Sequence, residues 1–97
     1  MAMGYWITFY RRVSNPAALA DYGKVAVPAI EAFGGRFLSR GTAIKAFEAG
    51  MTERSLVVEF DSPAKAIECY ESPAYQSALK ILAGTVERDI RILEGVS

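Results

Sequence analysis

The sequence predicts one α+β domain whose elements follow the order strand, helix, strand, strand, helix, strand. Three observations support this order: runs rich in aromatic and β-branched residues, apolar residues repeated at helical spacing, and proline directly after Asn or Ser. Elements in this order form the ferredoxin-like βαββαβ arrangement, an antiparallel sheet with the helices on one face. The 97 residues have the length of a single domain, so we assign residues 1–97 to it.

The first strand and the first helix are expected in the N-terminal third of the chain. Residues 4–12, GYWITFYRR, are rich in the residue types that favour strands. Residues 16–33 carry apolar side chains every three or four positions, which is the spacing of one helical face. Asn15 is a good N-cap, and Pro16 suits the first helical position because its missing N–H costs nothing there.

The predicted first helix contains one proline and ends at a glycine. Pro28 removes a backbone hydrogen bond and crowds the preceding turn, so we expect a kink or a break near Val27. Gly34 suits the left-handed residue that follows many helices. Residues 35–48 are then predicted to form one long strand interrupted at Gly41, since a glycine inside a strand marks a bend or a bulge.

The second half of the chain repeats the pattern. Residues 54–61 and 88–95 are apolar and β-branched, as expected of strands. Between them, two Ser-Pro pairs each supply an N-cap followed by proline at the first helical position. We therefore predict two helices there, at residues 63–71 and 73–83. The two pairs are Ser62-Pro63 and Ser72-Pro73.

Apolar residues occupy both faces of the predicted sheet. In the first strand, Trp6 and Tyr10 point to one side while Ile7 and Phe9 point to the other. The helices can bury only one face, and a large exposed apolar face would be an aggregation liability. We therefore predict a two-fold homodimer in which the two sheets pack face to face.

The charge and hydropathy of the chain exclude several classes of function. Lys and Arg together number 11, as do Asp and Glu, so no basic surplus is present to bind nucleic acid or a membrane surface. No apolar run is long enough to span a membrane, and no basic segment precedes the first apolar run as in a signal peptide. We expect a soluble cytoplasmic protein.

Residue types that commonly hold metals or act as nucleophiles are scarce. The chain has no His and one cysteine, Cys69, which excludes the Ser-His-Asp triad, a His-ligated haem and the common zinc sites. With no His to activate its thiol, Cys69 is expected to be a small core side chain. The glycine pair at Gly34 and Gly35 follows a helix instead of opening one, so it is not a phosphate loop. We expect no metal and no cofactor.

Four segments together resemble a known family. They are GYWIxFYRRVxNPxxLADY, PAIEAFGGRFLSRG, LVVEFDSPAKAIECYESPAYQ and the closing ILEG. The chain resembles, over residues 5–95, the domain of unknown function 1330 family of the dimeric α/β-barrel superfamily. The resemblance implies a ferredoxin-like protomer and a dimer whose two sheets form a barrel-like core. It implies no activity, because none is assigned to the family.

The wider superfamily includes cofactor-free monooxygenases that act on aromatic polyketides, haem-degrading enzymes and muconolactone isomerase. The resemblance implies a ligand pocket between sheet and helices, where these enzymes have theirs. Its haem enzymes commonly use a His ligand, which this chain lacks. Its cofactor-free monooxygenases use Asn, Trp and Tyr, and this chain has Asn15, Trp6 and several Tyr, although Asn15 already has a sufficient role as a helix cap.

Two charged residues interrupt the apolar strands and are candidates for chemistry. Glu59 could be a general base whose pKa is raised by burial, or the partner of an arginine at the sheet or dimer interface. Arg40 could anchor the carboxylate of a ligand, or pair with Glu59 or Glu94. Strict alternation along the strand puts Arg36, Leu38 and Arg40 on one face, but the register against the strand of Glu59 is not readable from one sequence.

Three aromatic residues are further candidates. Tyr22 and Tyr75 lie on the inner faces of their predicted helices, where each hydroxyl could orient a ligand or carry a proton, or where each ring could simply fill the core. Trp6 could line a ligand pocket, or be a core or interface aromatic. We thus predict catalytic roles for Glu59 and Tyr75, and ligand-binding roles for Arg40, Tyr22 and Trp6.

Three functions fit these residues. The first is an enzyme or binding protein for a small organic acid in a pocket under the helices, working without a metal; the second is a non-catalytic dimeric module. The first requires a cavity of roughly 300 Å³ or more that Arg40 and Glu59 both face. The third is cofactor-free oxygenation of an aromatic ligand, which would need a pocket lined by Trp6 and the tyrosines.

Overall fold

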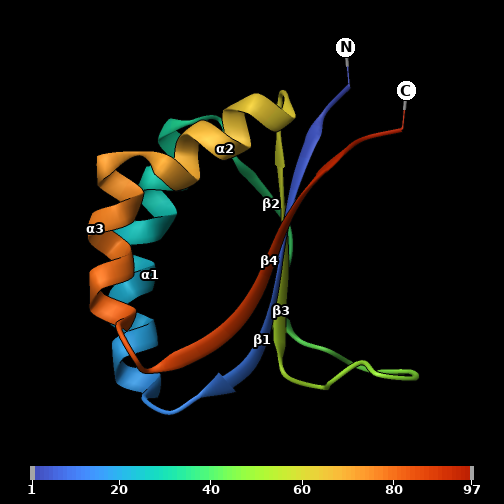
Figure 1. Ribbon diagram of the computed structural model, residues 1–97, viewed down its shortest axis with the longest axis vertical. Helices are drawn as coiled ribbons and strands as arrows, with labels where there is room; N and C mark the ends of the chain where they lie inside the picture. Colours follow the sequence, from blue (N-terminus) through green and yellow to red (C-terminus); the bar gives the residue numbers. More distant parts are fainter. Residues whose placement is uncertain (1, 97) are drawn as a thin grey trace.

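The computed structural model, which describes residues 2–96, is a four-stranded antiparallel sheet with three helices on one face (Figure 1). The strand order is β2-β3-β1-β4, which confirms the predicted ferredoxin-like arrangement. The two ends of the predicted domain, residues 1 and 97, lie outside the described residues. The elements are β1 (Gly4–Val13), α1 (Pro16–Ala32), β2 (Arg36–Thr42), β3 (Arg54–Phe60), α2 (Pro63–Glu71), α3 (Pro73–Leu82) and β4 (Val86–Glu94).

All three helices begin with the predicted cap and proline. The side-chain oxygens of Asn15, Ser62 and Ser72 each accept a hydrogen bond from a backbone N–H three residues on, at 3.1, 3.1 and 3.2 Å. Each bond satisfies a donor that the first helical turn leaves free. These caps fix the residue at which each helix begins.

Helix α1 runs through Pro28 without interruption, so the sequence-based alternative of a break at this proline is wrong. Pro28 and Lys24 both lie on the exposed side of the helix, where water can reach the Lys24 carbonyl that lacks a backbone partner. The helix ends as expected, because Gly34 adopts a φ of 82° after the C-cap residue Phe33.

Strand β2 is much shorter than the predicted strand at 35–48. It ends at Thr42, and residues 43–53 form a loop that projects from the body of the molecule (Figure 1). The apolar pattern suggested a strand, but Ile44 and Phe47 are exposed and contribute nothing to the core. Glu48 has a φ of 53°, a left-handed conformation that no strand accommodates.

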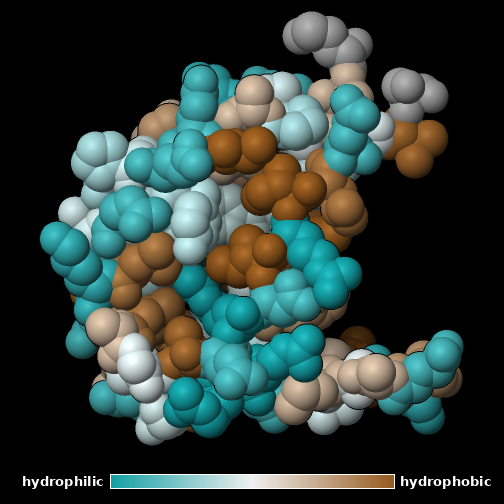
Figure 2. All heavy atoms as spheres, viewed as in Figure 1, coloured by the Kyte–Doolittle hydropathy of each residue, from teal (hydrophilic) through white to brown (hydrophobic). Residues whose placement is uncertain are grey.

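The core lies between the sheet and the helices. Trp6 stacks on Phe60 with ring centroids 6.1 Å apart and meets the edge of Tyr75 at 4.9 Å. Val58 and Ala78, from β3 and α3, are fully buried beside them. Figure 2 shows apolar residues along the seam where the helical layer meets the sheet. Among residues 2–96, no helix is long and apolar enough to cross a membrane.

The opposite face of the sheet is left open by the elements formed from residues 2–96 (Figure 1). We call it the open face; it carries Phe9 and Leu93, which are 46% and 50% exposed, beside Ile7 and Val57. It also carries ion pairs, such as Arg91 with Asp89 at 2.9 Å. The open face is therefore partly apolar and partly charged, which is a more regular alternation than the sequence suggested.

Candidate functional site

A β-bulge in β2 determines which face each of its side chains occupies. The register against β3 shifts between Phe37 and Ser39, so Leu38 is an extra residue. Arg36 is opposite Glu59 on the open face, whereas Arg40 is opposite Leu56 on the helix side. Strict alternation, which put Arg36 and Arg40 on one face, is therefore wrong at this position.

Arg40 lines a cavity of about 80 Å³ between α1 and the sheet. The cavity does not reach the roughly 300 Å³ expected above for an acid pocket, so it has room only for a small molecule or for one end of a larger one. Arg54 and Arg88 also line it, together with the predicted ligand-binding residues Trp6 and Tyr22. Its wall is thus a mixture of aromatic and aliphatic side chains, with three arginines.

The arginines of the cavity have no acidic partner in the part of the chain that the structure describes. No Asp or Glu from residues 2–96 lines the cavity, and none forms an ion pair there. The guanidinium of Arg40 lies over the Phe37 ring, 4.6 Å from its centroid. The Nε atom of Arg54 is buried and has no hydrogen-bond partner among these residues. Free donors therefore outnumber acceptors in this cavity.

Arg88 is held by tyrosine hydroxyls. Its Nη1 donates to the Tyr22 hydroxyl at 3.2 Å and, more weakly, to that of Tyr10 at 3.5 Å, while its Nη2 donates to Tyr75 at 3.4 Å. Burial alone lowers the pKa of Arg88, but the surrounding tyrosine oxygens outweigh it and hold that pKa above its usual value. Arg88 therefore stays charged.

The two predicted tyrosines meet each other. The hydroxyls of Tyr22 on α1 and Tyr75 on α3 are 2.6 Å apart, although 53 positions separate them in the sequence. Burial is the main cause that raises the pKa of both phenols. Tyr22 lines the cavity, but Tyr75 is fully buried behind it. Tyr75 therefore supports the site without facing the cavity.

Two small features keep the cavity open. The Trp6 indole N–H donates to the Thr8 hydroxyl at 2.8 Å, which fixes the ring against the sheet. Gly23 lines the cavity from α1, and a Cβ atom added there would meet nothing within 4 Å beyond its own helical turn and chain neighbours. Any larger residue at this position would extend into the cavity.

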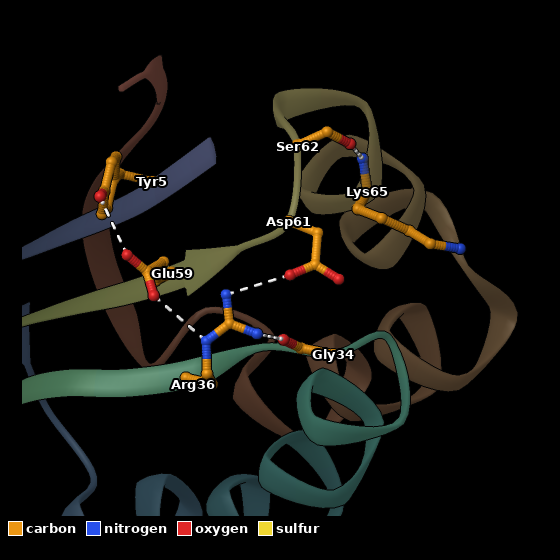
Figure 3. Close-up of polar contacts among 7 residues, drawn as sticks. All are labelled: Tyr5, Gly34, Arg36, Glu59, Asp61, Ser62 and Lys65. Carbon is orange, nitrogen blue, oxygen red and sulfur yellow. Dashed lines mark hydrogen bonds and ion pairs between the residues drawn. The ribbon is translucent and has the colours of Figure 1, made fainter. Parts of the chain in front are cut away.

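Glu59 lies away from the cavity, in a network on the open face (Figure 3). It accepts hydrogen bonds from the Tyr5 hydroxyl at 2.9 Å and from Arg36 Nε at 3.1 Å, and Arg36 also reaches Asp61 at 3.2 Å. The hydrogen bond to Glu59 raises the pKa of Tyr5. The structure therefore does not bring Glu59 together with Arg40. Glu59 instead pairs with an arginine, Arg36, which was the alternative to its role as a general base.

Sequence reasoning missed Arg54, Arg88 and Gly23. Arg54 is two positions before Leu56, and Arg88 is two positions before Ile90, so each shares the face of a core residue. An arginine two positions from a core residue of the same strand points to the core side of the sheet, and alternation along the strand alone could have revealed this. Gly23, inside an amphipathic helix on its apolar face, is a weaker signal of the same kind.

Comparison with known proteins identifies the family and the fold. A family model described as "Domain of unknown function (DUF1330)" matches residues 3–96. No curated protein matches the chain significantly.

Solved structures are similar over nearly the whole chain. A protein of unknown function from Rhodopseudomonas palustris has 20% identity and a TM-score of 0.75, with 99% of this chain and 84% of that chain covered. A dimeric ferredoxin-like protein of unknown function from Thermobifida fusca has 15% identity and a TM-score of 0.58, with 96% and 91% covered. A candidate antibiotic biosynthesis monooxygenase from Nitrosomonas europaea has 16% identity and a TM-score of 0.59, with 97% and 90% covered. At these identities the similarity shows the fold alone.

Cys69 lies buried on α2, with its Sγ 4.0 Å from the Ala29 carbonyl oxygen. Burial raises the pKa of its thiol to about 11, so the reactive thiolate is scarce at neutral pH. We expect a thiol reagent to label Cys69 in the folded protein at least about a hundredfold more slowly than in the unfolded chain, because the thiolate is scarce and the side chain is fully buried. Labelling rates measured with and without denaturant check this.

A matched control is Ser77→Cys in a Cys69→Ala background, because Ser77 is exposed on α3. That thiol should react at nearly the same rate in the folded and unfolded states. Equal rates for Cys69 in the two states would contradict its assignment as an enclosed core side chain.

Proposed function

The chain belongs to the family described as Domain of unknown function (DUF1330), and we propose that it binds a small organic acid in the cavity between α1 and the sheet. The observation that carries this proposal is that Arg40, Arg54 and Arg88 share one cavity whose described wall contains no carboxylate. An arginine recognises a carboxylate through paired, charge-assisted N–H donors. The carboxylate of a ligand would supply the acceptor that the protein does not.

The state of Arg54 supports an anionic ligand. A buried donor without a partner costs about 1–3 kcal/mol, and the Nε atom of Arg54 is such a donor among residues 2–96. Arg40 and Arg88 add like charges at the same cavity, which raises that cost. A bound carboxylate would offset the repulsion among the three guanidinium groups and supply an acceptor that the described wall lacks.

Gly23 supports a site that is kept open. Glycine inside a helix is less stable than alanine by roughly 0.5–1 kcal/mol, and an alanine methyl at this position meets no obstacle. A residue that filled the space would therefore stabilise the fold. The absence of such a side chain at position 23 is explained if a ligand occupies the space.

The proposed role is binding, and a catalytic role for Glu59 or Tyr75 is not part of it. Catalysis by proton abstraction needs a base within hydrogen-bond reach of the ligand. Glu59 is engaged by Arg36 and Tyr5 on the open face, and the Tyr75 hydroxyl is enclosed by Tyr22 and Arg88. Recognition of the acid is the chemistry that the cavity supports best.

Oxygenation of an aromatic ligand without a cofactor is a second candidate. Trp6, Tyr10 and Tyr22 line the cavity, as that function requires, and the similar protein from Nitrosomonas europaea is a candidate monooxygenase. The volume of about 80 Å³ is small for a polycyclic aromatic substrate. Acid binding is therefore the function that we favour.

We further propose that the protein is a homodimer joined through the open faces of its sheets. Phe9 and Leu93 are about half exposed there, next to Ile7 and Val57. The similar protein from Thermobifida fusca is described as dimeric. The charges of this face already pair within one protomer, so they add no unpaired charge to an interface. We also propose that the protein is cytoplasmic. The chain has a single cysteine, Cys69, whose thiol is buried and free, which is compatible with a reducing compartment.

Arg54 tests the proposed anion site. We expect Arg54→Met to weaken the binding of butyrate by about tenfold or more, the loss of a charge-assisted hydrogen bond. The single tryptophan, Trp6, lines the cavity, so its fluorescence reports binding in a titration. Arg36→Met is the matched control, because Arg36 lies in the same sheet on the open face and should leave the affinity unchanged. Equal effects of the two substitutions would refute the site.

Gly23→Ala tests whether the open space matters. We expect the substitution to raise the free energy of unfolding by about 0.5–1 kcal/mol, since alanine favours the helix. It should also weaken butyrate binding by about fivefold or more, since its methyl group overpacks the occupied cavity. Denaturant unfolding and the same titration provide the two measurements. A more stable variant with unchanged affinity would place the ligand elsewhere.

Phe9→Glu tests the dimer. A carboxylate in place of this half-exposed ring, beside Asp89, should raise the dissociation constant of the dimer by at least about tenfold, which sedimentation measures directly. Val25→Glu is the control, because Val25 is similarly exposed on the helical side of the molecule. A wild-type protein that sediments as a monomer at all concentrations would contradict the proposed assembly.

A further inference from the structure

The cavity wall opposite Arg40 and Arg54 is the hydrogen-bonded cluster of Arg88 with Tyr22 and Tyr75. The sheet order β2-β3-β1-β4 places Arg40 and Arg54 on the two strands at one side, and Arg88 on the edge strand at the other. Tyr22 comes from α1, which covers the cavity. Positive charge therefore lies at both sides of one small space.

The direction of the hydrogen bond between the two tyrosines follows from their surroundings. Tyr75 is fully buried, and its hydroxyl contacts only Tyr22 and Arg88 within residues 2–96. Arg88 can only donate, so the Tyr22 oxygen is the one acceptor for the Tyr75 proton. The reverse direction would leave that proton buried without a partner, at a cost of about 1–3 kcal/mol. Tyr75 therefore donates to Tyr22.

Tyr22 is consequently left with a proton to donate. Its oxygen accepts from Tyr75 at 2.6 Å and from Arg88 at 3.2 Å, which uses both of its acceptor positions. Tyr22 lines the cavity, and Tyr75 does not. The free O–H of Tyr22 is therefore available to an acceptor inside the cavity, beside the charge of Arg88.

The strand register separates the two groups of donors. Phe9 pairs with Ser55 on β3 and Tyr10 pairs with Arg88 on β4, so Arg54 and Arg88 lie level with each other on either side of β1. Two strand spacings set their backbones roughly 10 Å apart. Tyr10 lies between them on β1, so the two groups of donors approach the cavity from the two sides of its ring, an arrangement that suits a short ligand with an acidic group at each end.

We propose, on the basis of the acid-binding function above, that the ligand is a short-chain dicarboxylate. One carboxylate binds to Arg40 and Arg54, and the other accepts the Tyr22 O–H next to Arg88. A monocarboxylate would leave the Arg88 charge with neutral tyrosines alone, whereas a second carboxylate pairs with it in a partly desolvated site.

The wild-type protein tests this without any substitution. Succinate and butyrate share a carbon skeleton and differ in the second carboxylate, and both are titrated against Trp6 fluorescence, with inorganic phosphate as a third probe. We expect succinate to bind at least about tenfold more tightly than butyrate, and more tightly than phosphate. Equal affinities for succinate and butyrate would overturn the dicarboxylate assignment and leave acid binding intact. No binding of either acid would overturn the proposed function itself. Tighter binding of phosphate than of succinate would overturn the dicarboxylate as well.

Tyr22→Phe locates the second carboxylate. We expect this substitution to weaken succinate binding by about tenfold while the affinity for butyrate stays within about twofold, because only the second carboxylate meets the lost hydroxyl. Tyr5→Phe, which removes a hydroxyl on the open face, is the matched control and should change neither affinity. An equal loss for both acids in Tyr22→Phe would show a structural role for Tyr22 and overturn its assignment to the second carboxylate.

Discussion

The extra residue at Leu38 shifts the second half of β2 by one position against β3, and the distribution of charge over the sheet follows from that shift. Before the bulge, Arg36 pairs with the acids of the open face. After it, Arg40 faces the helices. Without the extra residue, alternation would give Ser39 the cavity position and leave Arg40 among the acids. The bulge thus keeps two arginines of one short strand in two different electrostatic environments.

The two faces of the sheet are consequently unequal in charge, although the chain as a whole is neutral. Two acids of the sheet, Glu59 and Asp89, are engaged by arginines on the open face. On the helix side, the hydrogen bonds that Arg88 forms within residues 2–96 all go to tyrosine hydroxyls. Phenol dipoles compensate a guanidinium less well than a carboxylate does. The cavity is therefore a place where positive charge is not fully compensated by the protein.

How much was predictable from the sequence depended on whether the signal was local. Caps and N-terminal prolines act within one turn, so the starts of the three helices at Pro16, Pro63 and Pro73 were predicted correctly. The bulge and the end of β2 depend on how a neighbouring strand pairs, which one sequence does not reveal. The hydrogen bond between Tyr22 and Tyr75 is a tertiary contact between two helices, and no local sequence pattern predicts it. The roles of the candidate residues stay predictions; the structure brings Arg40, Trp6 and Tyr22 to one cavity and leaves Glu59 on the open face.

Pro28 weakens one interior turn of α1 over the cavity. It leaves α1 one backbone hydrogen bond short, in the turn that contains Ala26 and Val27, which line the cavity. A helix opens most readily where its hydrogen-bond ladder is already incomplete. The roof of the cavity can therefore yield at this one turn while the caps, the aromatic core and the sheet stay in place.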